Sequence, residues 1–292
     1  MPRRWTTTAV VVVLALAALA CESGGGGGGI GQPSAGPPRP SATARPDLPA
    51  SMAALGDSIS SGFGTCLVLA NCQRNSWSSG DGLRVESHYR RLLEANPAIR
   101  GNGHNHAAAG ARVRQLADQA SAAVAAGADY VTVLIGANDA CRGRIEEMTE
   151  VSDFRAEVDR ALTVLKQGRP KARVLVVSIP DLYRLWEIGH SESQVVRAWN
   201  RGVCPALLAN PTSTAAADAS RRSAFRARID AYNKELTAAC RAYGSRCRHD
   251  GGAVHRVRFS LDMLNRLDYF HPDVDGQAKL AEVTWGSSGF TG

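Results

Sequence analysis

A serine lies where a short apolar run ends, and its position suits nucleophilic chemistry. Met52–Leu55 is apolar, and Gly56-Asp57-Ser58 follows it directly. This pattern predicts a buried strand that turns at the carboxyl edge of a parallel sheet and enters a helix at Ser58. Ligands bind at that edge of open α/β sheets, and helix N-termini favour negative charge. Ser58 is therefore a candidate nucleophile for acyl transfer, although Asp-Ser before a helix is also the usual pattern of an N-cap.

Two further predicted strands end in turns that carry functional residue types. Ile99–Ala111 predicts an extended segment that ends near Gly110, a residue that is free to adopt a positive φ. Tyr130–Ile135 is the clearest strand, because it is apolar and β-branched as a buried parallel strand should be. Gly136-Ala137-Asn138-Asp139 follows it. In a parallel sheet these turns share one edge with Ser58.

Taken in order, four motifs resemble the pattern of the SGNH (GDSL-type) hydrolase family. In that family Gly-Asp-Ser comes early, a glycine follows the next strand, Gly-x-Asn-Asp follows a later strand, and Asp-x-x-His comes near the end. This chain has Gly56-Asp57-Ser58, Gly110, Gly136-Ala137-Asn138-Asp139 and Asp268-Tyr269-Phe270-His271. Each motif alone is common in turns, helix caps or surface pairs. All four in this order, over essentially the whole domain, are much more specific.

The resemblance implies roles for five residues. Ser58 is expected to attack an ester carbonyl, His271 to take its proton, and Asp268 to orient and stabilise the imidazolium. The backbone N–H groups of Ser58 and Gly110 and the side-chain amide of Asn138 are expected to bind the oxyanion. The implied reaction is hydrolysis of a small-molecule or lipid carboxylic ester through an acyl-enzyme, without a metal or organic cofactor.

Other functions fit the sequence less well. The run Leu182–Trp186 follows a predicted strand and suits an acyl chain, which favours an esterase or lipase over a carbohydrate O-deacetylase of the same fold. A tethered solute-binding lipoprotein without catalysis commonly has two similar lobes, whereas this chain shows no internal repeat. Its formal net charge of +7 comes from scattered arginines, so nucleic-acid binding is not expected. The sequence lacks the G-x-S-x-G motif of the nucleophile elbow, which argues against the α/β-hydrolase family proper.

The remaining histidines and aspartates form no comparable motif. His104 and His106 could bind a metal, but no carboxylate or cysteine cluster accompanies them. His249-Asp250 is expected in a loop without a neighbouring motif. Asp57 and Asp139 are expected to shape their turns instead of taking part in the chemistry.

The chain has seven cysteines, and six of them lie beyond the N-terminal region. An even number in an exported chain indicates three disulfides, and six cysteines allow 15 connectivities. The two short spacings favour Cys66–Cys72 and Cys240–Cys247, which leaves Cys141–Cys204. The sequence has no close C-x-x-C pair, which a zinc site would normally require.

The N-terminal region predicts export. Residues 1–20 have the pattern of a signal peptide, because Arg3-Arg4 precedes an apolar run too short to span a bilayer. Leu19-Ala20-Cys21 resembles the box in which Cys21 becomes a lipidated first residue, although Ala18-Leu19-Ala20 also fits ordinary cleavage. Residues 21–49 predict a disordered Gly/Pro-rich tether. We expect a monomer outside the cell, either secreted or anchored to the outer face of the bacterial membrane.

Strands and helices must alternate to place these motifs at one edge. The pattern over residues 50–292 predicts one domain, a three-layer α/β/α doubly wound (flavodoxin-like), mostly parallel sheet. Further strands are expected at Arg173–Ile179 and, at the sheet edge, Val254–Phe259. Helical periodicity predicts helices at Leu83–Ala95, Val113–Val124, Phe154–Leu165, Glu192–Leu208, Arg221–Tyr243 and Gly276–Trp285.

Overall fold

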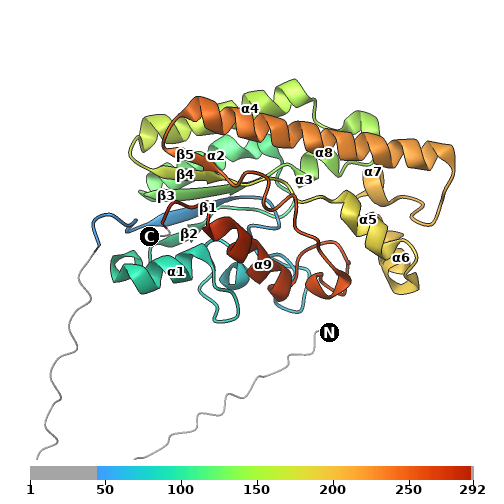
Figure 1. Ribbon diagram of the computed structural model, residues 1–292, viewed down its shortest axis with the longest axis horizontal. Helices are drawn as coiled ribbons and strands as arrows, with labels where there is room; N and C mark the ends of the chain where they lie inside the picture. Colours follow the sequence, from blue (N-terminus) through green and yellow to red (C-terminus); the bar gives the residue numbers. More distant parts are fainter. Residues whose placement is uncertain (1–44, 291–292) are drawn as a thin grey trace, which may run out of the picture. The chain divides into compact units, whose positions relative to one another are not determined.

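A five-stranded sheet lies at the centre of the computed structural model, which describes residues 45–290 (Figure 1). Its strands are β1 (Met52–Gly56), β2 (Gly103–Asn105), β3 (Tyr130–Leu134), β4 (Arg173–Val176) and β5 (Cys247–His249). They lie in the order β2-β1-β3-β4-β5, and all four pairings are parallel. The predicted doubly wound, flavodoxin-like fold is therefore confirmed. The predicted signal peptide, the lipidation site Cys21 and the tether up to residue 44 lie outside the described residues.

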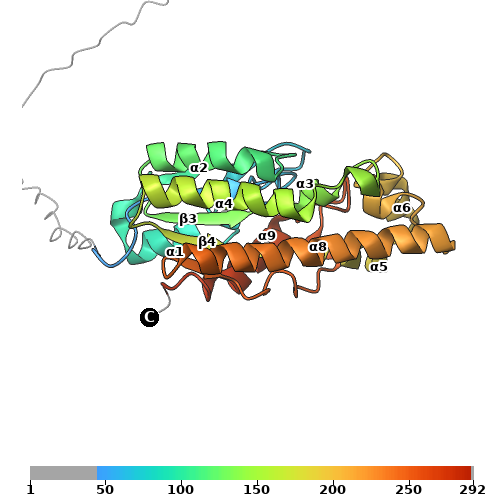
Figure 2. The same ribbon diagram turned by 90° about the horizontal axis from the view of Figure 1, so that it is seen from above.

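Helices cover both faces of the sheet (Figures 1 and 2). One face carries α2 (Leu116–Ala125), α4 (Val151–Gly168) and α8 (Ala216–Tyr243). The other face carries α1 (His88–Ala95) and α9 (Val274–Trp285). The described chain has four shorter α-helices, α3 (Ala137–Ala140), α5 (Tyr183–Gly189), α6 (Ser193–Trp199) and α7 (Pro205–Leu208), and five 3-10 helices of three residues each. Within residues 45–290, no helix has the length and apolar character needed to cross a membrane.

The central strand β3 and its neighbour β1 are the most buried strands. Every residue of β1 and β3 is buried, because helices cover both of their faces. Gly56 at the end of β1 has a φ of 139°, and a Cβ there would overlap the carbonyl oxygen of Leu134 on β3. Only glycine therefore allows the backbones of the two strands to approach so closely at this edge.

The helix predicted to begin at Ser58 is absent, and this expectation was wrong. The chain makes tight turns in which the N–H of Ser61 bonds to the Asp57 carbonyl and the N–H of Phe63 to the Ser58 carbonyl. Gly62 and Gly64 then adopt φ values of 66° and 80°, which end any helical progression. The free N–H groups at this strand end come from a turn and not from a helix N-terminus.

The edge strand predicted at Val254–Phe259 was also wrong. The edge strand is β5, and residues 254–259 form a turn and a loop. The cause is the Asp250 carboxylate, which accepts hydrogen bonds from the backbone N–H groups of Gly252 and Val254 and so turns the chain directly after β5. The alternating apolar residues of this segment are buried in a loop.

The long helix predicted at Glu192–Leu208 is divided into α6 and α7. Gly202 has a φ of 93° and Cys204 a φ of 43°, so the chain leaves the helical conformation between the two helices. A disulfide joins Cys204 to Cys141, which directly follows α3. The other disulfides are Cys66–Cys72 and Cys240–Cys247, so the structure has the pairing that the spacings favoured.

Asn96 attaches the start of the described chain to the domain. Its side-chain oxygen accepts a hydrogen bond from the N–H of Arg45, and its side-chain nitrogen donates to the carbonyls of Leu48 and Pro49. Residues 45–49, which the composition assigns to the tether, are therefore held against the residue that ends α1.

Candidate active site

The strand order brings the predicted site residues to one place. From β1 the chain crosses to β2 on one side and then returns to β3 on the other, so the connections diverge between β1 and β3. Ligands of doubly wound sheets bind at such a switch point, outside the carboxyl ends of the strands. Ser58 follows β1 by two residues, and Asn138 follows β3 within the short helix α3.

Ser58, His271 and Asp268 form a continuous chain of hydrogen bonds. The Oγ atom of Ser58 lies 2.9 Å from Nε2 of His271, a residue 213 positions later in the chain. Nδ1 of His271 lies 2.7 Å from Oδ2 of Asp268. With Nδ1 protonated, His271 donates to the Asp268 carboxylate and leaves Nε2 free to accept the Ser58 proton. This is the geometry that a serine nucleophile and its general base require.

The loop that carries His271 is fixed from within. Oδ1 of Asp268 accepts hydrogen bonds from the N–H groups of Phe270 and His271, at 2.9 and 3.1 Å. Tyr269, between them, has a φ of 50°, a conformation that bulky residues rarely adopt. Its carbonyl accepts a hydrogen bond from the indole N–H of Trp199, at 3.2 Å. These contacts hold the Asp268 carboxylate beside the His271 imidazole.

Two of the three expected oxyanion donors make no hydrogen bond within residues 45–290. In the described part of the chain, the N–H groups of Ser58 and Gly110 have no hydrogen-bond acceptor. Gly110 has a φ of 78° and a Cβ there would meet no atom within 4 Å, so its conformation and not crowding requires glycine. The side-chain amide of Asn138 donates to the carbonyl of Ala111, at 3.0 Å, and so fixes Asn138 beside the Gly110 turn.

Asp139 connects the turns that follow β2 and β3. Its carboxylate is buried and accepts hydrogen bonds from the N–H of Val113, at 2.9 Å, and from the Thr149 hydroxyl, at 2.8 Å. Burial raises the pKa of this carboxyl, and these two hydrogen bonds oppose the rise. Asp139 therefore positions its neighbours and does not point at the Ser58 hydroxyl.

Asp57, directly before the serine, is fully buried. One carboxylate oxygen accepts the N–H of Ile59 at 3.0 Å, and within residues 45–290 the other has no partner. Burial raises the pKa of Asp57 from 3.8 to about 7, and the hydrogen bond from Ile59 and the nearby charge of His271 oppose the rise. Like Asp139, this residue shapes its turn.

A cleft opens beside the Ser58 hydroxyl. Its polar residues include Ser58, Asn138 and His271, and the rest of its lining is mainly apolar. The apolar part comprises Ile59, Ala137, Pro180, Leu182, Leu185, Phe259, Leu264, Phe270 and Pro272. Of the run Leu182–Trp186, only Leu182 and Leu185 line the cleft, because α5 turns the other side chains away. Gly110 does not line it.

The other polar residues considered from the sequence lie apart from this cleft. The rings of His104 and His106 stack on each other, 6.1 Å between centroids. No group of three or more His, Cys, Asp or Glu side chains in residues 45–290 could hold a metal ion. His249 lies 3.5 Å from Asp250, whose carboxylate bonds to the Ser178 hydroxyl at 2.7 Å, so this pair supports the β4–β5 end of the sheet.

Two residues that position the site were not identified from the sequence. Asn265 donates from its side chain to the carbonyl of Gly64 and accepts the N–H of Leu267, so it joins the histidine segment to the serine segment. Gln277 on α9 accepts the N–H of Trp77 and donates to the carbonyl of Ile59, directly after Ser58. An isolated Asn or Gln carries no pattern in a single sequence, so only the structure identifies these two.

The chain matches one protein-family model and several solved structures. The model of the GDSL-like Lipase/Acylhydrolase family matches residues 54–279. A structure described as a GDSL-like lipase from Parabacteroides merdae is 15% identical, with a TM-score of 0.52, over 85% of this chain and 99% of that chain. An extracellular lipase from Streptomyces rimosus is 20% identical, with a TM-score of 0.43, over 81% and 99% of the two chains. Phospholipase A1 from Streptomyces albidoflavus is 21% identical, with a TM-score of 0.39, over 81% and 98%. No curated protein sequence matches the chain.

Proposed function

Because the chain belongs to the GDSL-like lipase/acylhydrolase family, we propose that it is a serine ester hydrolase that works through an acyl-enzyme on Ser58. The observation that carries this proposal is the chain of hydrogen bonds from Ser58 through His271 to Asp268, at 2.9 and 2.7 Å. A serine hydroxyl is a weak nucleophile unless a base accepts its proton, and the imidazole is already within reach.

In the first half of the reaction, Oγ of Ser58 attacks the ester carbonyl as Nε2 of His271 takes its proton. The C–O bond to the alcohol then breaks, and His271 returns the proton to the leaving alcohol. In the second half, His271 takes a proton from water, the hydroxide attacks the acyl-enzyme, and the acid leaves as Ser58 regains its proton. The Asp268 carboxylate stabilises the imidazolium in both halves.

The developing oxyanion needs donors beside Ser58. We assign this role to the N–H groups of Ser58 and Gly110 and to the amide of Asn138. The two backbone N–H groups have no other acceptor in residues 45–290, and the Asn138 amide uses one hydrogen for Ala111 and keeps the other. Loss of one such donor typically costs about 10²–10³ in turnover.

The lining of the cleft favours esters with an apolar acyl chain. Leu182, Leu185 and Phe259 lie on the same cleft as the Ser58 hydroxyl, and burial of methylene groups against them stabilises a bound chain. An acetylated sugar would leave this apolar surface unused. We therefore propose esterase or lipase activity, with carbohydrate O-deacetylation as the alternative.

The test is ester hydrolysis by the wild type and by Ser58→Ala. The variant should lose at least about 10³-fold in kcat on a short p-nitrophenyl ester, because within residues 45–290 Ser58 provides the only hydroxyl that is hydrogen-bonded to the His271 ring. A fluorophosphonate probe should label the wild type and not the variant, whereas a solute-binding protein would not react at all. Retained turnover by Ser58→Ala would overturn the proposal.

A panel of substrates distinguishes the two ester classes. If the cleft holds an acyl chain, kcat/KM should rise from acetyl to medium-chain p-nitrophenyl esters. A preference for an acetylated sugar over all of them would favour the O-deacetylase.

We also propose that the protein works outside the cell. Residues 45–290 contain three disulfides. Disulfides persist in oxidising environments and are rare in cytosolic proteins, which supports this proposal.

A further inference from the structure

Exposed apolar side chains gather beside the active-site histidine. We call residues Cys66–Cys72 the cystine loop and residues Leu264–Pro272 the histidine loop. Five large apolar side chains are exposed in residues 45–290: Leu67 (92%), Val68 (57%) and Leu69 (46%) on the cystine loop, Leu267 (49%) on the histidine loop, and Leu83 (81%) on neither. Such side chains normally occur singly on a protein surface, whereas four of these five lie on two loops.

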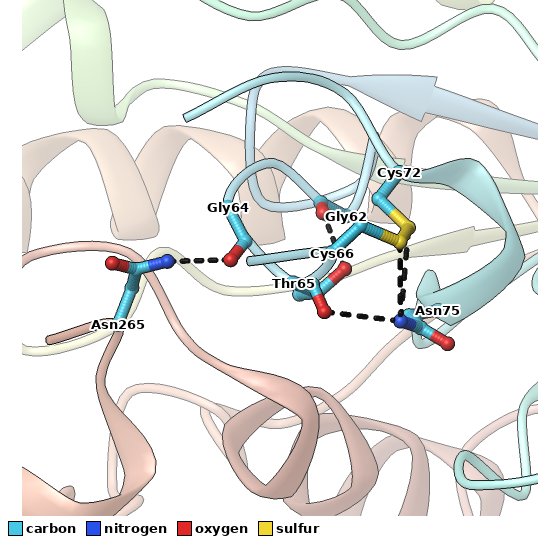
Figure 3. Close-up of a disulfide and its surroundings, with 7 residues drawn as sticks. All are labelled: Gly62, Gly64, Thr65, Cys66, Cys72, Asn75 and Asn265. Carbon is cyan, nitrogen blue, oxygen red and sulfur yellow. Dashed lines mark hydrogen bonds between the residues drawn. A yellow bond between two sulfur atoms is a disulfide. The ribbon is translucent and has the colours of Figure 1, made fainter. Parts of the chain in front are cut away.

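The base of the cystine loop is fixed from two sides (Figure 3). The side-chain amide of Asn265, on the histidine loop, donates to the carbonyl of Gly64, and that of Asn75 donates to the carbonyl of Thr65, at 3.2 Å. The disulfide Cys66–Cys72 closes the loop itself. Residues 66–71 beyond this base are all exposed. The apolar tip is therefore presented to solvent by a rigid support.

Both loops adjoin the reacting groups. The ring of Phe63, three residues before the cystine loop, lies against the His271 imidazole, with 4.7 Å between ring centroids. Leu267 directly precedes Asp268. The hydrogen bond from Asn265 to Gly64 joins the histidine loop to the segment that leads into the cystine loop, and Leu264, Phe270 and Pro272 of the histidine loop line the cleft.

We propose that Leu67, Val68, Leu69 and Leu267 form a surface that docks on a lipid aggregate, from which a water-insoluble ester enters the cleft. This inference rests on the proposed ester hydrolase function. Aliphatic side chains on a rigid loop partition into the boundary between headgroups and acyl chains, which brings the cleft to the substrate.

The size and charge of this surface favour a lipid over a protein partner. Four aliphatic side chains offer far less area than the roughly 1,200–2,000 Å² that a stable protein interface buries. The segment Ser58–Gly80 contains no acidic residue, and the exposed Arg74 and Arg266 lie close in sequence to the two loops. Cations beside apolar side chains suit membranes that contain anionic lipids.

Vesicle sedimentation tests the docking surface without turnover. The full chain, with Cys21→Ser to exclude an attached lipid and Ser58→Ala to prevent hydrolysis, is mixed with vesicles of phosphatidylcholine and phosphatidylglycerol in equal amounts. Changing Leu67, Val68 and Leu69 together to serine should weaken binding by at least about tenfold. Leu267→Ser alone should weaken it by a smaller factor.

The control is Leu83→Ser, which removes a leucine that is also exposed but lies on neither loop. It should leave vesicle binding unchanged. The inference is overturned if the parent chain does not bind the vesicles, if the triple variant binds as well as the parent, or if Leu83→Ser weakens binding as much as the triple variant does.

Hydrolysis by chains that retain Ser58 separates this inference from the proposed function. On a soluble p-nitrophenyl ester, the triple variant should match the parent, which also shows that it is folded. On an emulsion of a long-chain ester it should lose at least about tenfold in rate. Equal rates for the triple variant and the parent on the emulsion would contradict lipid docking and leave the enzyme assignment intact. No hydrolysis of any ester by the parent would contradict the enzyme assignment itself.

Discussion

At the scale of single residues, the candidate site contains groups to which we assign the chemistry and groups to which we assign only positioning. Ser58, His271 and Asp268 form one line of hydrogen bonds, of which Ser58 and His271 line the cleft. Asp57 and Asp139, although adjacent to Ser58 and Asn138 in sequence, are buried and bind backbone N–H groups. Their raised pKa values reflect burial and do not mark them as general acids or bases.

Asp57 should make the stability of the protein depend on pH. Its pKa is about 7 in the folded chain and near 3.8 when unfolded, so between these values the folded chain holds a proton that the unfolded chain has released. The contribution of this group to the free energy of unfolding therefore falls as the pH rises through this window. Asp57→Asn should be more stable than the wild type by on the order of 4 kcal/mol at about pH 8, and by only about 1 kcal/mol at about pH 4.5.

Urea unfolding of both proteins at the two pH values measures this effect. The amide of asparagine can still accept the N–H of Ile59, so the turn should be retained. Asp81→Asn, at an exposed carboxylate, is the control and should leave the pH dependence unchanged. An equal change in stability at both pH values would show that Asp57 does not hold an extra proton in the folded chain over this range, which would contradict the prediction.

At the scale of elements, disulfides and side-chain amides hold the short segments around the cleft. The helix α3, which carries Asn138, has only four residues and cannot be stable by itself. Cys141 directly after it is joined to Cys204 at the start of α7, and the N–H of Ala206 bonds to the carbonyl of Arg142. Gln277 and Asn265 hold the serine segment in the same way from the C-terminal part of the chain.

Removal of the Cys141–Cys204 disulfide should destabilise the protein more than removal of either local disulfide. It connects residues 63 positions apart, whereas Cys240 and Cys247 are 7 apart. Because a longer closed loop restricts the unfolded chain more, the pair Cys141→Ala and Cys204→Ala should lose about 4 kcal/mol, and the pair Cys240→Ala and Cys247→Ala about 2 kcal/mol. Urea unfolding curves of the two double variants give both values, and the reverse order would contradict the loop-length argument.

At the scale of the whole molecule, the first and last parts of the domain meet over one sheet edge. Ser58 follows the first strand by two residues, and His271 lies in the segment before the last helix. The switch point between β1 and β3 leaves space there for the cleft, so the fold alone explains why residues 213 positions apart share a hydrogen bond.

The attachment of the whole molecule to a membrane is a separate prediction. If Leu19-Ala20-Cys21 is a lipoprotein cleavage site, the native protein should begin at Cys21 and carry lipid on its thiol. Intact mass of the protein isolated from its own cells measures this directly. Cys21→Ser should then release the protein into the medium. A native N-terminus with an unmodified Cys21, or one beyond Cys21, would contradict anchoring and indicate secretion.

Much of the fold followed from local properties of the sequence. Apolar periodicity located β1, β3, β4 and most helices, because burial requires the same pattern wherever the element lies in space. It failed at Val254–Phe259, where a buried loop has the alternation of a strand, and at Ser58, where Gly62 and Gly64 support turns and no helix. In both places a side-chain hydrogen bond or a glycine conformation decided the outcome.

By itself, the sequence determined the order of the motifs and the residue types at the strand ends, since these are properties of neighbouring residues. Only the tertiary structure decided that Ser58 contacts His271, that Asn265 and Gln277 hold the serine segment, and that four exposed apolar side chains lie on two adjoining loops. These relations depend on how segments far apart in the chain pack together, and packing is decided by the sum of many weak contacts that leave no pattern in any one segment.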